Sequence, residues 1–242
     1  MTPPPVGDRQ PGKRDAVEQM FDGIAARYDL LNRVLSFGID RLWRRRAINW
    51  LIEDRPRRLL DVATGTGDLS LAALRLGPEK VVGVDLSEGM LVVGREKVAR
   101  RGATDRVTLL QADAAHLPFE DGHFDAALVA FGVRNFEDLD AGLAEIGRVL
   151  RPGAPLIVLE FSQPDRAPFK QLYEFYSRHI LPRVGAAVSG HREAYDYLQA
   201  SAAVFPSGEA FLVRLLKSGF TRVQQRRLTF GVASLYKGYR VG

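Results

Sequence analysis

Short apolar runs alternate with amphipathic helical patterns through the middle of this 242-residue chain, and this alternation limits its fold more than any other feature. The runs lie at 58–64, 80–87, 106–113, 124–133 and 154–162, and helical patterns at 67–76, 88–101 and 138–150 separate them. Nearly continuous apolar strands suit a sheet that is buried on both faces, and a strand–helix–strand order favours parallel pairing. We therefore expect an α/β fold with helices on both faces of the sheet.

The two ends of the chain depart from this alternation. Residues 1–13 carry four prolines and little apolar material, so we expect a disordered tail. Apolar spacing then predicts helices over 17–35, with an interruption near Tyr28 or Asn32, and over 41–52. At the other end, the runs 220–228 and 231–240 flank a short gap and predict an antiparallel pair at one edge of the sheet. We expect one domain over 14–242, with a helical cap at 14–55 and a lid or substrate insertion at 163–219.

The composition excludes several classes of protein. There is no cysteine, hence no disulfide framework or thiolate metal site, and we expect no metal. No apolar run reaches the ~18 residues that a membrane span requires, and the first residues lack a secretory apolar core. These features predict a soluble protein of the cytoplasm.

The net charge is +5, and arginine supplies most of the basic residues. Seven arginines fall within 41–58, a stretch that we call the basic segment, where only Glu53 and Asp54 oppose them. Such a segment can serve solubility, an anionic membrane surface or nucleic acid. No nucleic-acid-binding motif accompanies it, so we expect no nucleic-acid partner.

A glycine-containing corner follows the first strand, in the sequence DVATGTGDLS. Gly65 and Gly67 allow the backbone to turn tightly and to approach a ligand. A dinucleotide-binding corner would have a third glycine where this chain has Ser70, so the fit to NAD is poor.

Acidic residues end three consecutive predicted strands, at Asp61, Asp85 and Asp113. The carboxyl ends of parallel strands form the edge at which open α/β sheets bind ligands. Asp85 can accept hydrogen bonds from both ribose hydroxyls, while Asp113 and the amide of Ala114 can bind an adenine ring. Each aspartate alone would also suit a helix cap.

Asp61 precedes Gly65 by four residues and would repel the pyrophosphate of NAD. A ligand with positive charge, such as the amino-acid moiety and sulfonium of S-adenosylmethionine, suits it better. The string D-x-A-x-G-x-G resembles motif I of class I methyltransferases, in which glycine usually replaces Ala63. The resemblance implies S-adenosylmethionine as cofactor.

Longer strings narrow the resemblance. YDLLNRVLSFGIDRLW (28–43) and RVLRPGAPLIVLEFS (148–162) are similar to the two signatures of the ubiquinone/menaquinone biosynthesis C-methyltransferases, with Asp40 in place of the usual histidine and Ala154 in place of glycine. FGVRNF, HILPRVG and the final GVASLYKGYR also match. This family resemblance implies a seven-stranded Rossmann-like class I methyltransferase sheet, mostly parallel with an antiparallel edge strand. It also implies cofactor contacts at Thr66, Asp85, Asp113, Ala114 and Ala130, the last of which lacks the family's serine hydroxyl.

The resemblance further implies C-methylation of a quinol ring that carries a polyprenyl tail. Removal of a phenolic proton makes the adjacent ring carbon nucleophilic, so the site needs a group that stabilises the phenolate. We expect Arg134 to do so, Asn135 to orient a water molecule, and Tyr28 to fold over the cleft. Demethylmenaquinol is the first expectation for the substrate, and a 2-methoxy-6-polyprenyl-1,4-benzoquinol is the alternative.

Other functions stay open at this point. An NAD-dependent oxidoreductase would share the sheet and Asp85, a non-enzymatic S-adenosylmethionine-binding or RNA-associated module would suit the positive charge, and a small-molecule O-methyltransferase would share the cofactor site. If the substrate carries a polyprenyl tail, the basic segment could serve to attach the enzyme peripherally to an anionic leaflet, where that tail lies. A homodimer is also open.

Overall fold

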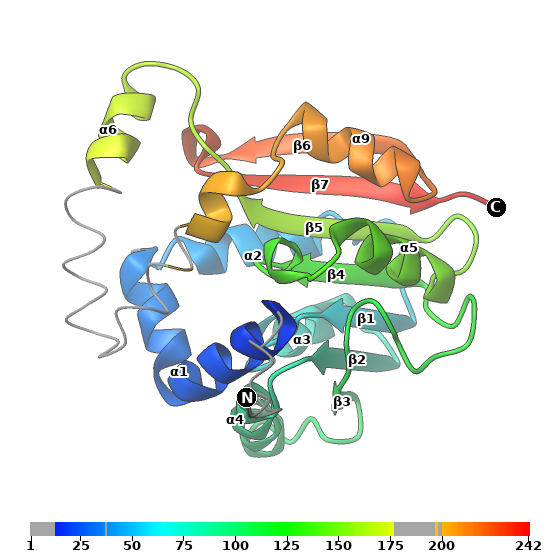
Figure 1. Ribbon diagram of the computed structural model, residues 1–242. Helices are drawn as coiled ribbons and strands as arrows, with labels where there is room; N and C mark the ends of the chain where they lie inside the picture. Colours follow the sequence, from blue (N-terminus) through cyan, green and yellow to red (C-terminus); the bar gives the residue numbers. More distant parts are fainter. Residues whose placement is uncertain (1–12, 37, 177–196, 198–199) are drawn as a thin grey trace, which may run out of the picture.

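The computed structural model describes residues 13–36, 38–176, 197 and 200–242. They form an α/β fold around a seven-stranded sheet of order β3-β2-β1-β4-β5-β7-β6, as expected (Figure 1). The strands are β1 (Arg58–Val62), β2 (Lys80–Asp85), β3 (Val107–Gln111), β4 (Ala126–Ala130), β5 (Pro155–Phe161), β6 (Phe220–Leu228) and β7 (Ala233–Arg240).

The first five strands pair in parallel, so their carboxyl ends share one edge of the sheet. Strand β4 lies in the middle of the sheet and all five of its residues are buried, which explains why each of them is apolar. The predicted antiparallel pair at the edge is confirmed. Strand β7 runs antiparallel to both β5 and β6, and β6 is the outermost strand.

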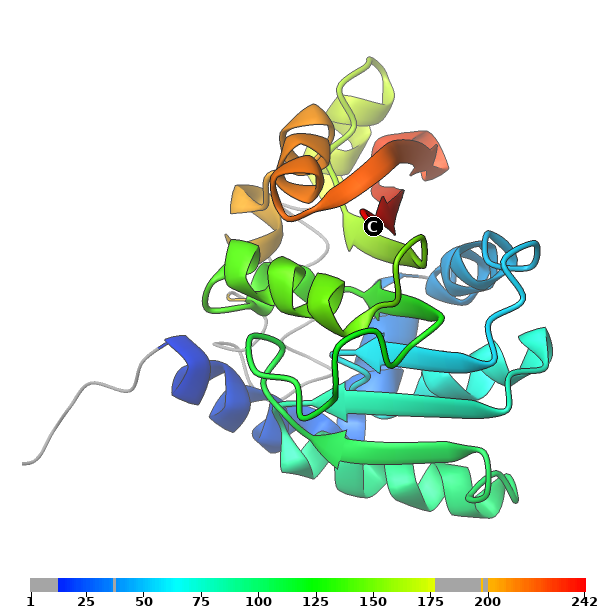
Figure 2. The same ribbon diagram turned by 90° about the vertical axis from the view of Figure 1, so that its right-hand side faces the viewer.

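Helices cover both faces of the sheet, as predicted (Figure 2). One face packs against α2, α3 and α4, and the other against α5 and α9. The bounds are α2 (Asp40–Asn49), α3 (Asp68–Ala73) with the short η1 (Leu74–Leu76), α4 (Glu88–Arg100), α5 (Leu139–Val149) and α9 (Glu209–Lys217). Neighbouring residues of β1 show the two faces directly, since Leu59 packs towards the first layer and Leu60 towards the second.

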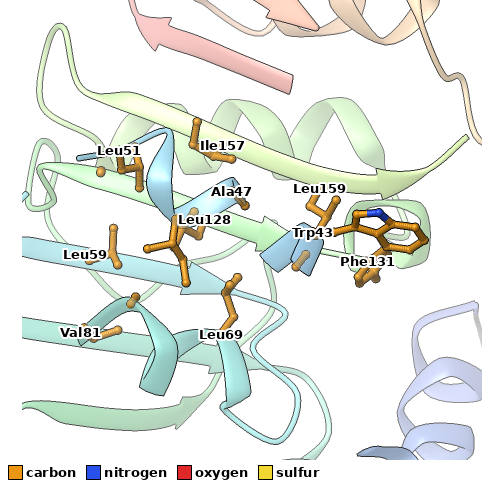
Figure 3. Close-up of a cluster of buried hydrophobic side chains, with 14 of the residues drawn as sticks. Trp43, Ala47, Leu51, Leu59, Leu69, Val81, Leu128, Phe131, Ile157 and Leu159 are labelled. Atoms are coloured by element: carbon orange, nitrogen blue, oxygen red, sulfur yellow. The ribbon is translucent and has the colours of Figure 1, made fainter. Parts of the chain in front are cut away.

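The close-up in Figure 3 shows how α2 joins this core. Its Trp43 and Ala47 lie with Phe131 and with strand residues of β4 and β5. The Trp43 side chain is 3% exposed, and its indole nitrogen donates a hydrogen bond to Thr229 Oγ1 at 2.8 Å. Helix α2 is therefore part of the core and holds a fixed position relative to the ends of β4 and β5.

Helix α1 (Lys13–Leu35) crosses the carboxyl edge of the sheet and packs on α4 (Figure 1). The predicted interruption near Tyr28 or Asn32 is wrong, because the helix is continuous. Asp22 fixes it to the start of α4, where its Oδ1 accepts hydrogen bonds from Ser87 Oγ at 2.5 Å and from the Gly89 amide at 2.9 Å.

The predicted tail, except for Lys13, lies outside the described residues. So does much of the predicted insertion at 163–219, of which the structure describes α6 (Phe169–Phe175) and the part from 200 onwards. Within the described part of the chain, no helix is both long and apolar enough to span a bilayer.

Candidate active site

A cleft of about 770 Å³ lies at the carboxyl edge of the sheet, between α1 and the loops that follow β1, β2, β3 and β4. It brings together side chains and backbone from residues that are far apart in the sequence. Of the predicted site residues, its lining includes Tyr28, Gly65, Asp85, Asp113, Ala114, Ala130 and Asn135. We call this the main cleft.

The loop between β1 and α3 forms one wall of the main cleft. Ala63, Gly65 and Gly67 have φ values of +54°, +56° and +75°, so the chain turns through left-handed conformations at alternate residues. Gly132, which follows β4, allows the loop to approach, because a Cβ at Gly132 would lie 2.4 Å from the Cβ of Ala63. The loop is thus held in place by close backbone packing.

Asp85 joins this loop to the end of β2. Its carboxylate accepts hydrogen bonds from the Gly65 amide at 2.7 Å and from the Ser87 amide at 3.0 Å. Burial raises the pKa of Asp85, and these amide donors oppose the shift. The carboxylate keeps further acceptor sites for a ligand in the cleft.

Asp61 lies beneath the same loop and is fully buried. Its Oδ2 accepts hydrogen bonds from Thr64 Oγ1 at 2.7 Å and Ser70 Oγ at 2.6 Å, while its Oδ1 has no hydrogen-bond partner among the described residues. Burial raises the pKa of Asp61 to about 6, against the lowering effect of the two hydroxyls and of Arg44. A buried acceptor without a donor is costly and suits a cationic ligand group.

Asp113 and Ala114 lie where β3 ends, and both line the main cleft with Ala112. Asp113 Oδ1 accepts a hydrogen bond from the Ala115 amide at 2.9 Å, which fixes the turn. Ala130 lines the cleft from the end of β4 and is 7% exposed, so it contributes a methyl group where the resemblance would have a hydroxyl.

Thr66 belongs to a second, polar cleft of about 430 Å³ on the other side of the loop. Its hydroxyl donates to Asp29 Oδ1 at 2.6 Å and accepts from Lys97 Nζ at 2.8 Å. Lys97 also pairs with Asp68 at 2.8 Å and with Asp29. This network fixes α1 and α4 to the glycine-containing loop.

Arg134 and Asn135 lie in the short helix η2 (Val133–Asn135), directly after β4. The Arg134 side chain is 3% exposed, and its Nη1 donates to Glu160 Oε1 at 2.5 Å and to the Phe131 carbonyl at 2.8 Å. Its Nε donates to Ser201 Oγ at 3.2 Å. No hydrogen bond from Arg134 Nη2 to a described residue is present, and Arg134 is not among the residues that line either cleft.

Two residues of this site were not identified from the sequence as site residues. Glu160, at the end of β5, is fully buried, and burial raises its pKa against the effect of Arg134. Its Oε2 lacks a hydrogen-bond partner among the described residues, as does Oδ1 of Asn135. Glu160 lies within the second family signature, but the sequence alone indicated no function for it. The other residue is Arg44, which lines the second cleft and which the sequence did not distinguish from the other arginines of the basic segment.

Across the described residues, no three His, Asp or Glu side chains gather as a metal ion would require.

Comparison with known proteins identifies the family. The profile of the ubiE/COQ5 methyltransferase family matches residues 9–240. A curated demethylmenaquinone methyltransferase from Bacteroides fragilis is 51% identical over 93% of this chain and 92% of its own length. One from Thermus thermophilus is 48% identical over 91% of this chain and its full length, and a ubiquinone/menaquinone biosynthesis C-methyltransferase from Geobacter sulfurreducens is 45% identical over 93% of this chain and 89% of its own length.

Solved structures show the same fold at low identity. A SAM-dependent methyltransferase from Thermotoga maritima has a TM-score of 0.62 at 22% identity and covers 92% of this chain and 99% of its own. A phosphoethanolamine N-methyltransferase from Haemonchus contortus, in complex with S-adenosyl-L-methionine, has a TM-score of 0.57 at 18% identity over 77% of this chain and 49% of its own. The chain belongs to the ubiE/COQ5 methyltransferase family and is an S-adenosylmethionine-dependent methyltransferase.

Proposed function

We propose that this enzyme methylates a ring carbon of demethylmenaquinol and so forms menaquinol in menaquinone biosynthesis. The observation that carries the proposal is the 51% identity, over nearly the whole of both chains, to a demethylmenaquinone methyltransferase. A benzoquinol in ubiquinone biosynthesis is the second candidate, because relatives named for both pathways reach 45% identity.

The residues of the main cleft fit S-adenosylmethionine. Bound there, the cofactor supplies an electrophilic methyl group on a sulfonium. In our proposal Asp85 accepts the ribose hydroxyls, Asp113 and the Ala114 amide hold the adenine, and the unpartnered Oδ1 of Asp61 accepts the ammonium group. The loop from Gly65 to Gly67 and the end of β4 at Ala130 enclose the rest.

Arg134 then stabilises the phenolate through the two donors of Nη2. A charge-assisted hydrogen bond in a water-poor site is much stronger than the same bond in water, and it lowers the pKa of the ring hydroxyl. Glu160 orients the guanidinium through the bond between Oε1 and Nη1. Because Glu160 is fully buried beside Arg134, the pair is held in one geometry before the substrate binds.

Asn135 and Tyr28 both line the main cleft, the first from η2 and the second from α1. The buried Oδ1 of Asn135 lacks a donor among the described residues, so it can accept a hydrogen bond from the ring hydroxyl or from the water molecule that removes the proton. The Tyr28 ring lies over the glycine-containing loop, where a Cβ at Gly65 would be 3.7 Å from its Cε1. We propose that Tyr28 closes the cleft and aligns the ring carbon with the methyl group.

The polyprenyl tail requires an apolar path and a source of lipid. We propose that the region 163–219 acts as a lid, because Leu172 and Phe175 of α6 are 64% and 56% exposed. We also propose that the basic segment attaches the enzyme to an anionic leaflet at the cytoplasmic face. The segment displays exposed arginines beside Leu42 and Ile52, which are 47% and 51% exposed, a combination that suits a lipid surface.

The test offers the purified enzyme S-adenosylmethionine with a demethylmenaquinol or with the benzoquinol, and identifies the products by NMR. We expect a new C-methyl signal with demethylmenaquinol. A product methylated on oxygen, or turnover of the benzoquinol alone, would overturn the assignment. Co-sedimentation with phosphatidylcholine vesicles of increasing phosphatidylserine content tests the membrane proposal. The proposal fails if the bound fraction of the enzyme does not change with the phosphatidylserine content.

A further inference from the structure

The second cleft adjoins the main cleft across the glycine-containing loop. The two share Tyr28, Ala63, Gly65 and Ala130 in their linings, and residues of α1 and α2 also line the second cleft. Its lining is strongly charged, with Asp29, Asp40 and Asp68 facing Arg33, Arg41 and Arg44. Equal numbers of the two charges disfavour a polyanion such as phosphate and favour a group that carries both signs.

Arg44 stands out among these charges because it is mostly buried without a hydrogen bond. Its side chain is 14% exposed, whereas Arg33 and Arg41 are exposed. Its Nε lies 3.7 Å from Asp40 Oδ2, beyond hydrogen-bond distance, and its guanidinium carbon lies 5.4 Å from the Phe131 ring centroid. No described residue accepts a hydrogen bond from it. The ion pair with Asp40 compensates part of the charge of this mostly buried guanidinium but uses none of its hydrogen-bond donors, so the arrangement is suited to an anionic ligand group.

Asp61 provides the opposite charge nearby. Thr64 lines the second cleft together with Arg44, and its hydroxyl donates to Asp61 Oδ2 at 2.7 Å, so the Asp61 carboxylate lies directly behind the wall of that cleft. The unpartnered Oδ1 of Asp61 can accept from a cation, and the guanidinium of Arg44 can donate to an anion. An α-amino acid carries both groups on one carbon and matches this pair.

We propose that Arg44 binds the α-carboxylate of the methionine moiety of S-adenosylmethionine, beside Asp61, which binds the ammonium. Arg44 is thus a cofactor-binding residue and does not contribute to the surface charge of the basic segment. The inference deepens the proposed function and rests on it only for the cofactor, since the identity of the quinol plays no part. It also gives α2 a role in the site, because its packing through Trp43 fixes where Arg44 lies.

The test measures binding by calorimetry to S-adenosylhomocysteine and to 5′-methylthioadenosine, which has the adenosine but not the amino acid. We expect Arg44→Met to weaken S-adenosylhomocysteine binding about 10- to 100-fold, as for the loss of a charged hydrogen-bonding partner. Binding of 5′-methylthioadenosine should stay within twofold. Arg44→Lys keeps the charge without the planar fork and should fall between the two. The matched control, Arg75→Met, removes an exposed arginine and should change neither affinity.

Two results would overturn the inference. Unchanged binding of S-adenosylhomocysteine to Arg44→Met would show that the carboxylate binds elsewhere, and an equal loss for both ligands would show a general distortion of the site. Because 5′-methylthioadenosine binding itself reports a folded adenosine site, misfolding is detected in the same experiment. An enzyme that shows the expected pattern but methylates no quinol would overturn the proposed function and leave this inference intact.

Discussion

Titration of Asp61 should make folding and cofactor binding respond to pH in opposite directions. The carboxyl group is fully buried, and burial raises its pKa from 3.8 to about 6. The folded protein therefore binds this proton more tightly than the unfolded chain does. The contribution to the free energy of unfolding is complete below pH 3.8, and it is lost as the pH rises through 6.

The magnitude follows from the difference in pKa. A difference of about two units corresponds to about 3 kcal/mol over the whole range, since one unit is about 1.36 kcal/mol. When the pH falls from 8 to 5, it passes only about one unit below the folded-state pKa of Asp61. We therefore expect the protonation of this group to raise the free energy of unfolding by about 1.4 kcal/mol over that interval. Ammonium binding needs the ionised carboxylate, so affinity for S-adenosylhomocysteine should fall about tenfold over the same interval.

The assay compares urea unfolding of the wild type and Asp61→Asn at pH 5 and pH 8 without ligand. Other groups titrate too, including Asp85 and Glu160, whose pKa values are also raised by burial. The effect of Glu160 cancels in the difference between the two proteins, as does any constant cost of the asparagine, whereas Asp85 interacts with Asp61 and its titration enters the difference together with that of Asp61. Calorimetry with S-adenosylhomocysteine at the same two pH values gives the second measurement.

A difference in the free energy of unfolding that is the same at pH 5 and pH 8 would refute the reasoning about burial. A tenfold change in ligand affinity that persists in Asp61→Asn would show that another group carries the pH dependence of binding.

Three further substitutions test other parts of the structure. Gly132→Ala should shift the glycine-containing loop, because the new Cβ would lie 2.4 Å from Ala63 Cβ; calorimetry should show at least tenfold weaker S-adenosylhomocysteine binding. Asp138→Ala removes the cap of α5 and should cost about 1 kcal/mol in urea unfolding, with that affinity unchanged. Glu160→Gln removes the charged partner of Arg134, so it should lower kcat about 100-fold in steady-state assays and leave cofactor affinity within twofold. An unchanged kcat would contradict the positioning role of Glu160.

Much of the fold could be predicted because its signals are local. The apolar run that forms β4 has to be buried on both faces, and the helical pattern at 138–150 places α5 within one residue of its observed bounds at either end. The continuity of α1 was not predicted, because polar residues interrupt the apolar pattern at its middle. Contacts with α4, such as that of Asp22 with the Gly89 amide, support the continuous helix. Tertiary packing overrode the local signal there.

The site divides in the same way. Asp85 and Asp113 could be placed together because each ends a parallel strand, and parallel strands end at a common edge. The role of Ser70 could not be foreseen, because its hydroxyl reaches Asp61 only after the loop has folded back on itself. The catalytic assignment of Arg134 stays a prediction, and the structure adds the buried partner that the sequence did not reveal.

The sequence by itself determined the α/β class, the pairing of the last two strands and the edge of the sheet at which the main cleft lies. Each of these follows from periodicity and from residue types at strand ends, which are properties of neighbouring residues. Only the tertiary structure decided which charges are desolvated. Arg44 and Arg134 look like the other arginines of the chain, but α2 places the first in the wall of the second cleft, mostly buried, and the end of β5 buries the second with Glu160. The strength of a charge interaction depends on burial, and burial is set by contacts between distant segments.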